Sequence, residues 1–128
     1  MCVISDRFFD STTVYQGVAR RLDAQWVQQL NQFAVGDCVP DLTLVLDVDV
    51  NKARVRILRR VRTVSGDRME QEPIEFYQAV RAAYRELAKK EPSRVVLIDG
   101  DQSMDQIERE IWEVISSRFP NLQSKPKN

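Results

Sequence analysis

Three short apolar runs, separated by longer helical patterns, constrain the fold of this chain more than any other feature. The runs are Cys2–Ser5, Leu42–Val48 and Val95–Ile98. The middle run is almost continuously apolar and β-prone, which is typical of a parallel strand covered on both faces. Strands that alternate with helices indicate a parallel sheet. We therefore predict an α/β fold with three parallel strands and helices between them.

Residues with capping preferences mark the expected helix ends. Asp and Ser favour the position before a helix because their side-chain oxygens accept hydrogen bonds from free N–H groups of the first turn. Glycine favours the position after the last turn, and Gly36 is expected to end the second helix. The predicted N-caps are Asp10 or Ser11, Asp23, Asp49, and Ser103 paired with Gln106 in a capping box.

The 128 residues suffice for one domain with its own core, which we place at residues 1–122, with a polar tail at 123–128. No apolar run approaches the roughly 18–20 residues needed to cross a bilayer, and the first residues do not resemble a signal peptide. Cys2 and Cys38 form no C-x-x-C pair, so buried free thiols in a reducing cytosol are favoured over a disulfide. A cytoplasmic protein without a membrane partner is therefore expected.

Histidine is absent, and 19 basic side chains balance 19 acidic ones. The lack of histidine excludes Ser-His-Asp and Cys-His nucleophilic sites, but phosphoryl transfer depends mainly on positioning and charge stabilisation. Seven basic residues and one acid, Asp67, lie between Lys52 and Arg68. The segment is either a solvated helix face or the neighbour of an anionic ligand. No aromatic stacking residues accompany the arginines, which argues against nucleic acid.

Asp6 and Arg7 follow the first apolar run directly. A carboxylate at a strand tip can hold Mg²⁺, and a guanidinium can bind a phosphate bidentately. Alternatively, the pair merely ends the strand and bridges to a helix. Ser11, Thr12 and Tyr15 follow at spacings that place them on one helix face. They are either substrate contacts or a capping hydroxyl beside a core tyrosine.

Four segments together resemble one family. Residues 6–17 read DRFFDSTTVYQG, and this stretch resembles the DR[YFH] motif and following helix of thymidylate kinases. The other matching segments are PDLTLVLDVD at 40–49, GDRMEQE at 66–72 and IDGDQS at 98–103. The resemblance covers nearly all of residues 2–119. One family motif does not occur in the chain, namely the G-x-x-x-x-G-K-[ST] phosphate loop.

The resemblance implies a P-loop nucleoside monophosphate kinase fold. The complete sheet of that family has five parallel strands, with the first strand between the third and the fourth. This chain would supply only the third to fifth strands and their flanking helices, so the fold is expected to be incomplete.

The resemblance also implies roles for individual residues. Arg7 would contact the phosphate of dTMP, and Asp6 would belong to the Mg²⁺ and phosphate network. Thr12 would face the thymine edge, and Tyr15 would stack near the deoxyribose. The further substrate-binding candidates are Ser11 and Gln16. The candidates for catalysis, besides Asp6 and Arg7, are the lid arginines Arg60, Arg62 and Arg68. The candidates for binding ATP are Arg56, Arg59, Gly100 and Asp101.

The implied reaction is transfer of the γ-phosphate of ATP to dTMP, with Mg²⁺, in an enzyme whose full-length form is a homodimer. Without a phosphate loop the chain alone is expected to be inactive. The alternative is a non-catalytic nucleotide-binding or interaction module, either a degenerate kinase relative or half of a split enzyme. A deoxynucleoside kinase fits the motif at 6–17 less well.

Overall fold

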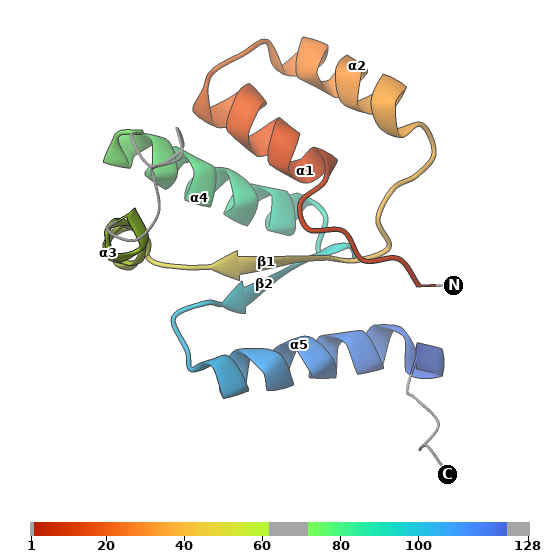
Figure 1. Cartoon of the computed structure of the whole chain (residues 1–128). Helices are drawn as coiled ribbons and strands as arrows, with labels where there is room; N and C mark the ends of the chain where they lie inside the picture. The colour runs from red at the N-terminus through yellow and green to blue at the C-terminus, as the bar shows by residue number, and fades with distance from the viewer. Residues whose placement is uncertain (1, 62–71, 123–128) are drawn as a thin grey trace.

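The computed structural model describes residues 2–61 and 72–122. It has three layers, with α5 on one face of a small sheet and α4 and α1 on the other (Figure 1). The elements, in chain order, are α1 (Phe9–Thr12), η1 (Thr13–Ala19), α2 (Ala24–Val35), β1 (Thr43–Asp47), α3 (Val50–Val61), α4 (Ile74–Lys90), β2 (Val95–Asp99), α5 (Met104–Arg118) and η3 (Pro120–Leu122).

The sheet has two parallel strands among the described residues. β1 pairs with β2 in a register that runs from Thr43 opposite Val95 to Asp47 opposite Asp99. Two of the three predicted strands and their parallel direction are thus confirmed. β1 is not covered on both faces, because its residues are only half-buried and the side chain of Leu46 is 51% exposed. The α/β class is confirmed in an incomplete form.

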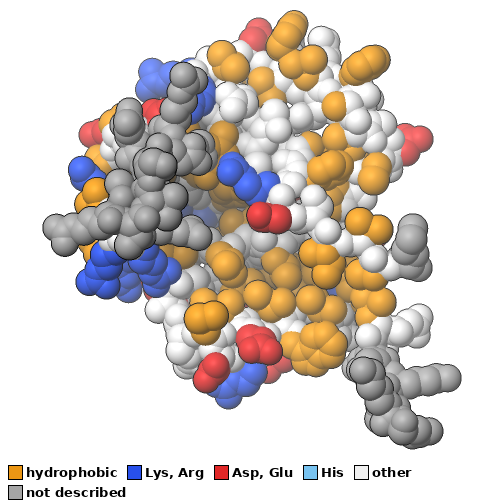
Figure 2. All heavy atoms as spheres, in the orientation of Figure 1, with side chains coloured by type: hydrophobic (Ala, Val, Ile, Leu, Met, Phe, Trp, Pro, Cys, Tyr) orange, Lys and Arg blue, Asp and Glu red, His pale blue; other side chains and the backbone are white. Residues whose placement is uncertain are grey.

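The third predicted strand, Cys2–Ser5, does not form. These residues belong to no ladder, and Val3 and Ile4 are 78% and 91% exposed. A strand exists only where a neighbour accepts and donates its backbone hydrogen bonds, and no described residue offers such a partner to this segment. Asp6 and Arg7 consequently do not lie at a strand tip. Figure 2 shows hydrophobic side chains spread over much of the face of the molecule that is seen in Figure 1.

Most predicted helix ends are confirmed. Asp23 accepts a hydrogen bond from the Trp26 N–H at the start of α2, and Gly36 follows its last residue. The Asp49 carboxylate accepts from the first N–H groups of α3. Ser103 and Gln106 form the expected capping box at α5.

The predicted start of the first helix is wrong. α1 begins at Phe9, so Asp10 lies inside its first turn and caps nothing. Its carboxylate is instead buried against partners from other elements, described below. α1 continues directly into η1, a π-helical segment of wider turns.

The main core lies between η1 and α4. Val14, Phe76 and Val80 are each less than a tenth exposed, and the rings of Tyr15 and Tyr84 pack against them. A helix-to-helix core of this kind fixes η1 on α4. The candidate residues of η1 are thereby held against one side of α4.

One further expectation differs from the structure. Cys2 and Cys38 are free thiols, as predicted, but both are exposed rather than buried. Cys2 is exposed because the strand that would have buried it does not form.

Within residues 2–61 and 72–122, no helix has the length and apolar character required to cross a membrane.

Candidate functional site

Arg7 adopts an unusual backbone conformation that projects its side chain toward η1. Its φ is 65°, in the left-handed region that residues other than glycine rarely adopt. The guanidinium lies 4.7 Å from the centroid of the Tyr15 ring, and Nε donates a long hydrogen bond of 3.5 Å to Ser11 Oγ. Backbone strain of this kind, which costs on the order of 1–3 kcal/mol, tends to occur at functional sites.

Tyr84 of α4 contacts both Ser11 and Tyr15, the two residues that Arg7 also contacts. The hydroxyl oxygens of Ser11 and Tyr84 lie 2.9 Å apart, and the rings of Tyr15 and Tyr84 meet edge to face with centroids 6.5 Å apart. We call Arg7, Ser11, Tyr15 and Tyr84 the arginine–tyrosine cluster. It combines a cation, hydroxyl groups and an aromatic face, a set that suits a phosphorylated ligand with a flat base.

The remaining substrate candidates lie around this cluster. Thr12 is exposed, and Gln16 is half-buried within η1. Asp6 is exposed immediately before Arg7, and its carboxylate makes no hydrogen bond or ion pair with a described residue. The structure therefore brings together Arg7, Ser11 and Tyr15. Among the described residues, no side-chain hydrogen bond or ion pair joins Asp6, Thr12 or Gln16 to them.

A buried ion pair, missed by sequence reasoning, anchors the start of α1. Arg94 donates to both oxygens of Asp10 at 2.8 and 2.9 Å, and both residues are more than nine-tenths buried. Thr43 donates to the same carboxylate, and the Arg94 guanidinium lies over the Phe9 ring. The hydrogen bond to Asp10 raises the pKa of Arg94, so this guanidinium stays charged. This anchor ties the segment that carries Arg7 and Ser11 to the amino ends of β1 and β2.

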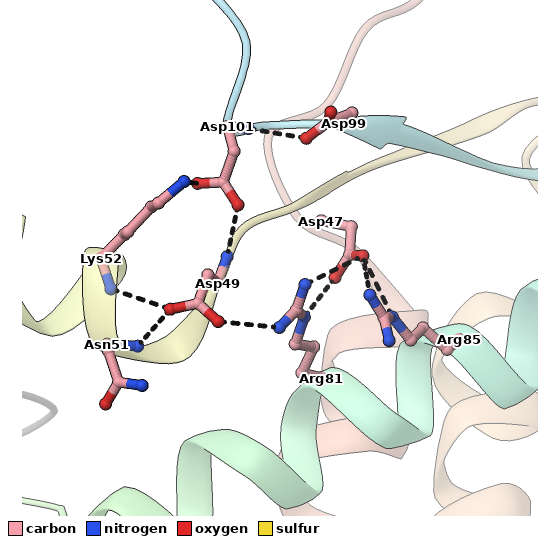
Figure 3. A network of polar contacts seen from close by, with 8 residues as sticks. All are labelled: Asp47, Asp49, Asn51, Lys52, Arg81, Arg85, Asp99 and Asp101. Atoms are coloured by element: carbon pink, nitrogen blue, oxygen red, sulfur yellow. Dashed lines mark hydrogen bonds and ion pairs between the residues drawn. The ribbon is translucent and has the colours of Figure 1, made fainter.

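A second polar network lies at the opposite, carboxyl ends of the strands (Figure 3). Arg81 and Arg85 of α4 both donate to the carboxylate of Asp47, with shortest distances of 2.7 and 2.6 Å. Burial acts to raise the pKa of Asp47, but its hydrogen bonds and charge pairing with the two arginines outweigh this and lower it. Arg81 also reaches Asp49 at 3.4 Å. This network fixes α4 on the end of β1.

Gly100 and Asp101, the candidates at the adenine border, belong to the same region. A Cβ atom at Gly100 would lie 2.5 Å from Val48 Cγ2, so close packing of the turn itself requires glycine. The Asp101 carboxylate accepts from the N–H of Asp49 at 3.0 Å and pairs with Lys52 at 3.7 Å (Figure 3). Both residues hold the ends of the strands together, and their role toward ATP stays a prediction.

The lid arginines are only partly within the described structure. Arg56 and Arg59 are exposed on α3, in the cationic segment predicted from the sequence. The side chain of Arg60 and the residues Arg62 and Arg68 lie outside the described residues. Their assignment to the transferred phosphate therefore stays a prediction.

In the described part of the chain, no cluster of three or more His, Cys, Asp or Glu side chains could hold a metal ion. Mg²⁺ is commonly held by only one or two carboxylates together with the phosphates of a substrate. Asp6 is exposed, and no hydrogen bond or ion pair joins its carboxylate to a described residue. The residues present thus fit Mg²⁺ that enters with a nucleotide.

Comparison with known proteins identifies the family to which these motifs belong. A family model described as thymidylate kinase matches residues 1–111. A thymidylate kinase of Magnetococcus marinus is 43% identical over 117 residues, which are 91% of this chain and 55% of the relative. Thymidylate kinases of Kosmotoga olearia and Halothermothrix orenii are 41% and 43% identical, over 85% and 86% of this chain. The chain belongs to the thymidylate kinase family.

The extent of the match bears on function. This thymidylate kinase family member spans about half the length of the curated relatives it matches, between 51% and 55% for these three. All candidate residues, from Asp6 to Asp101, fall inside the matched range. The roles of these residues and the activity of a whole enzyme are therefore matters for proposal.

Proposed function

We propose that this chain supplies the acceptor side of a thymidylate kinase, the side that binds dTMP and presents its phosphate to ATP. Arg7 binds the acceptor phosphate, and Tyr15 packs against the deoxyribose. Ser11, Thr12 and Gln16 contact the remainder of the nucleotide. The arginine–tyrosine cluster, in which Arg7 lies over Tyr15 and beside Ser11, is the observation that carries this proposal.

The chemistry follows from charge and position. Transfer of a phosphoryl group brings two anionic groups together in line, so cations must neutralise them and hold them in place. Arg7 does this for the acceptor, and the arginines between Arg56 and Arg68 do it for the transferred group. Asp6 would help to hold Mg²⁺ that enters with ATP, and the ion would supply further charge neutralisation. A phosphate loop provided by another segment cradles the donor phosphates.

The exposed apolar surfaces agree with a chain that works with partners. Val3, Ile4 and Leu46 are all more than half exposed, beside the position where family resemblance expects a further strand. Pairing of residues 2–5 with that strand would place Asp6 and Arg7 at the carboxyl edge of the sheet, where ligands bind in open α/β folds. Trp26, Leu30 and Phe33 of α2 are also exposed and offer a surface for the homodimer found in the family.

Titration of the ¹⁵N-labelled chain with dTMP tests the proposal. We expect dTMP at millimolar concentrations to shift the backbone NMR signals of Arg7, Ser11 and Tyr15. We expect UMP, which carries a 2′-hydroxyl and lacks the thymine methyl group, to shift them less. If dTMP shifts none of these signals, or if UMP binds equally well, the chain does not carry an acceptor site for dTMP.

A further inference from the structure

Within the arginine–tyrosine cluster, Tyr84 is the residue that comes from α4, and its hydroxyl lies against Ser11. Tyr84 and Ser11 are 73 positions apart in sequence, yet their oxygens lie 2.9 Å apart. The Tyr84 ring packs against Val14, Phe76 and Val80 of the core, which fixes where its hydroxyl points. A rigid group from a neighbouring helix thus meets the hydroxyl that accepts from the side chain of Arg7.

Either hydroxyl of this contact can be the donor, and the direction decides which groups of Ser11 stay free. A serine hydroxyl has one hydrogen to donate and two lone pairs to accept with. One lone pair of Ser11 accepts from Arg7 Nε, at 3.5 Å. If Tyr84 donates to the second lone pair, both are occupied and the Ser11 hydrogen points to a third partner. Burial raises the pKa of the Tyr84 hydroxyl, which therefore keeps its proton and remains a donor.

We propose that Tyr84 is a positioning residue for the acceptor phosphate: its hydroxyl donates to Ser11 Oγ and leaves the Ser11 hydrogen free to donate to a phosphate oxygen beside Arg7. The inference rests on the proposed function for the identity of the ligand. It adds that Tyr84 supports binding of the phosphate group rather than of the nucleoside.

Affinity measurements with dTMP and thymidine separate these two parts of the ligand. Tyr84→Phe keeps the ring and removes only the hydroxyl. We expect this change to weaken dTMP binding by the full chain about 3- to 10-fold, the usual size for one lost hydrogen bond. Thymidine has no phosphate, and its affinity should change less than about 2-fold by the same reasoning.

Thr13→Val is the matched control, because it also removes one hydroxyl from the same helical segment. Thr13 Oγ1 accepts from Asn31 at 2.9 Å and donates to the Phe9 carbonyl at 3.2 Å, away from Arg7. This variant should leave the preference for dTMP over thymidine unchanged. If Tyr84→Phe leaves dTMP affinity unchanged, or weakens dTMP and thymidine equally, the positioning role is overturned.

Ser11→Ala provides an independent route to the same answer. In a Ser11→Ala background, adding Tyr84→Phe should have no further effect on dTMP, and additive losses would contradict the proposal. A wild-type chain that binds no dTMP would refute the proposed function instead. The NMR signal of the Arg7 Nε–H in the ligand-free chain then decides the role of Tyr84. It should shift in Tyr84→Phe and not in Thr13→Val, and an unchanged signal would overturn the inference.

Discussion

Replacing Arg94 with alanine is expected to lower the free energy of unfolding by about 3–5 kcal/mol, because a buried carboxylate is left without its counter-charge. Asp10 and Arg94 are only 5% and 8% exposed, and two hydrogen bonds of 2.8 and 2.9 Å join them. Removing the arginine leaves Asp10 with Thr43 as its remaining hydrogen-bond partner. For a domain of ordinary stability, a loss of this size approaches the whole margin that keeps it folded.

Urea unfolding at neutral pH, followed by tryptophan fluorescence, measures this loss. Lys89→Ala removes one side of an exposed ion pair with Glu86 and should leave the midpoint almost unchanged. A double variant, Asp10→Leu with Arg94→Met, removes both charges and should be much more stable than Arg94→Ala alone. An Arg94→Ala chain as stable as the wild type would show that this ion pair does not anchor α1.

Replacing Arg7 with alanine is expected to reduce kcat/KM for dTMP by about 30- to 1000-fold in an enzyme completed with a phosphate-loop segment. The estimate corresponds to a loss of about 2–4 kcal/mol of transition-state stabilisation, typical of a single electrostatic group in an active site. The physical reason is that the acceptor phosphate loses a bidentate, charge-assisted contact while it must approach the phosphates of ATP.

Two further variants make the Arg7 result specific. Arg21→Ala is the matched control, since Arg21 also has a left-handed backbone, with φ of 55°, but lies beyond the other end of the same helical segment. It should retain nearly full activity. Arg7→Lys keeps the charge without the planar fork and should be intermediate. If Arg7→Ala keeps the kinetics of the wild type, Arg7 does not belong to the site.

The features that sequence reasoning predicted correctly are local ones. Asp23 at α2 and the Ser103–Gln106 pair at α5 cap helices through contacts within three residues, so the sequence alone contains both partners. The spacing of Ser11 and Tyr15 likewise placed them on one side of a helix, and Arg7 contacts both. Helix periodicity and capping chemistry act over a single turn and require no knowledge of the rest of the fold.

The features that were predicted wrongly depend on distant partners. Cys2–Ser5 has the composition of a strand, but no neighbouring strand is available to it among the described residues. Asp10 has the side chain of an N-cap, but Arg94, 84 positions away, binds its carboxylate.

In the candidate site, too, the residues that are close in sequence could be predicted and the distant ones could not. Arg7, Ser11 and Tyr15 could be chosen from one motif, whereas Tyr84 joins them from a helix 73 positions beyond Ser11. Asp47, Arg81 and Arg85 were also missed as a network. An acid that ends an apolar run and two arginines one helical turn apart were the available signals, but nothing in the sequence joined them.

The central claim is that this chain carries the acceptor side of a thymidylate kinase. The most direct test measures phosphoryl transfer by the chain with and without a completing segment. The assay measures ADP release from ATP, Mg²⁺ and dTMP. The completing segment is the part of the Magnetococcus marinus relative that its alignment with this chain does not cover. We predict no measurable turnover by the chain alone, and dTMP-dependent turnover on adding the segment, approaching the ~1–100 s⁻¹ typical of kinases. Turnover by the chain alone, or a complex of the two parts that releases no ADP with dTMP, would contradict the account.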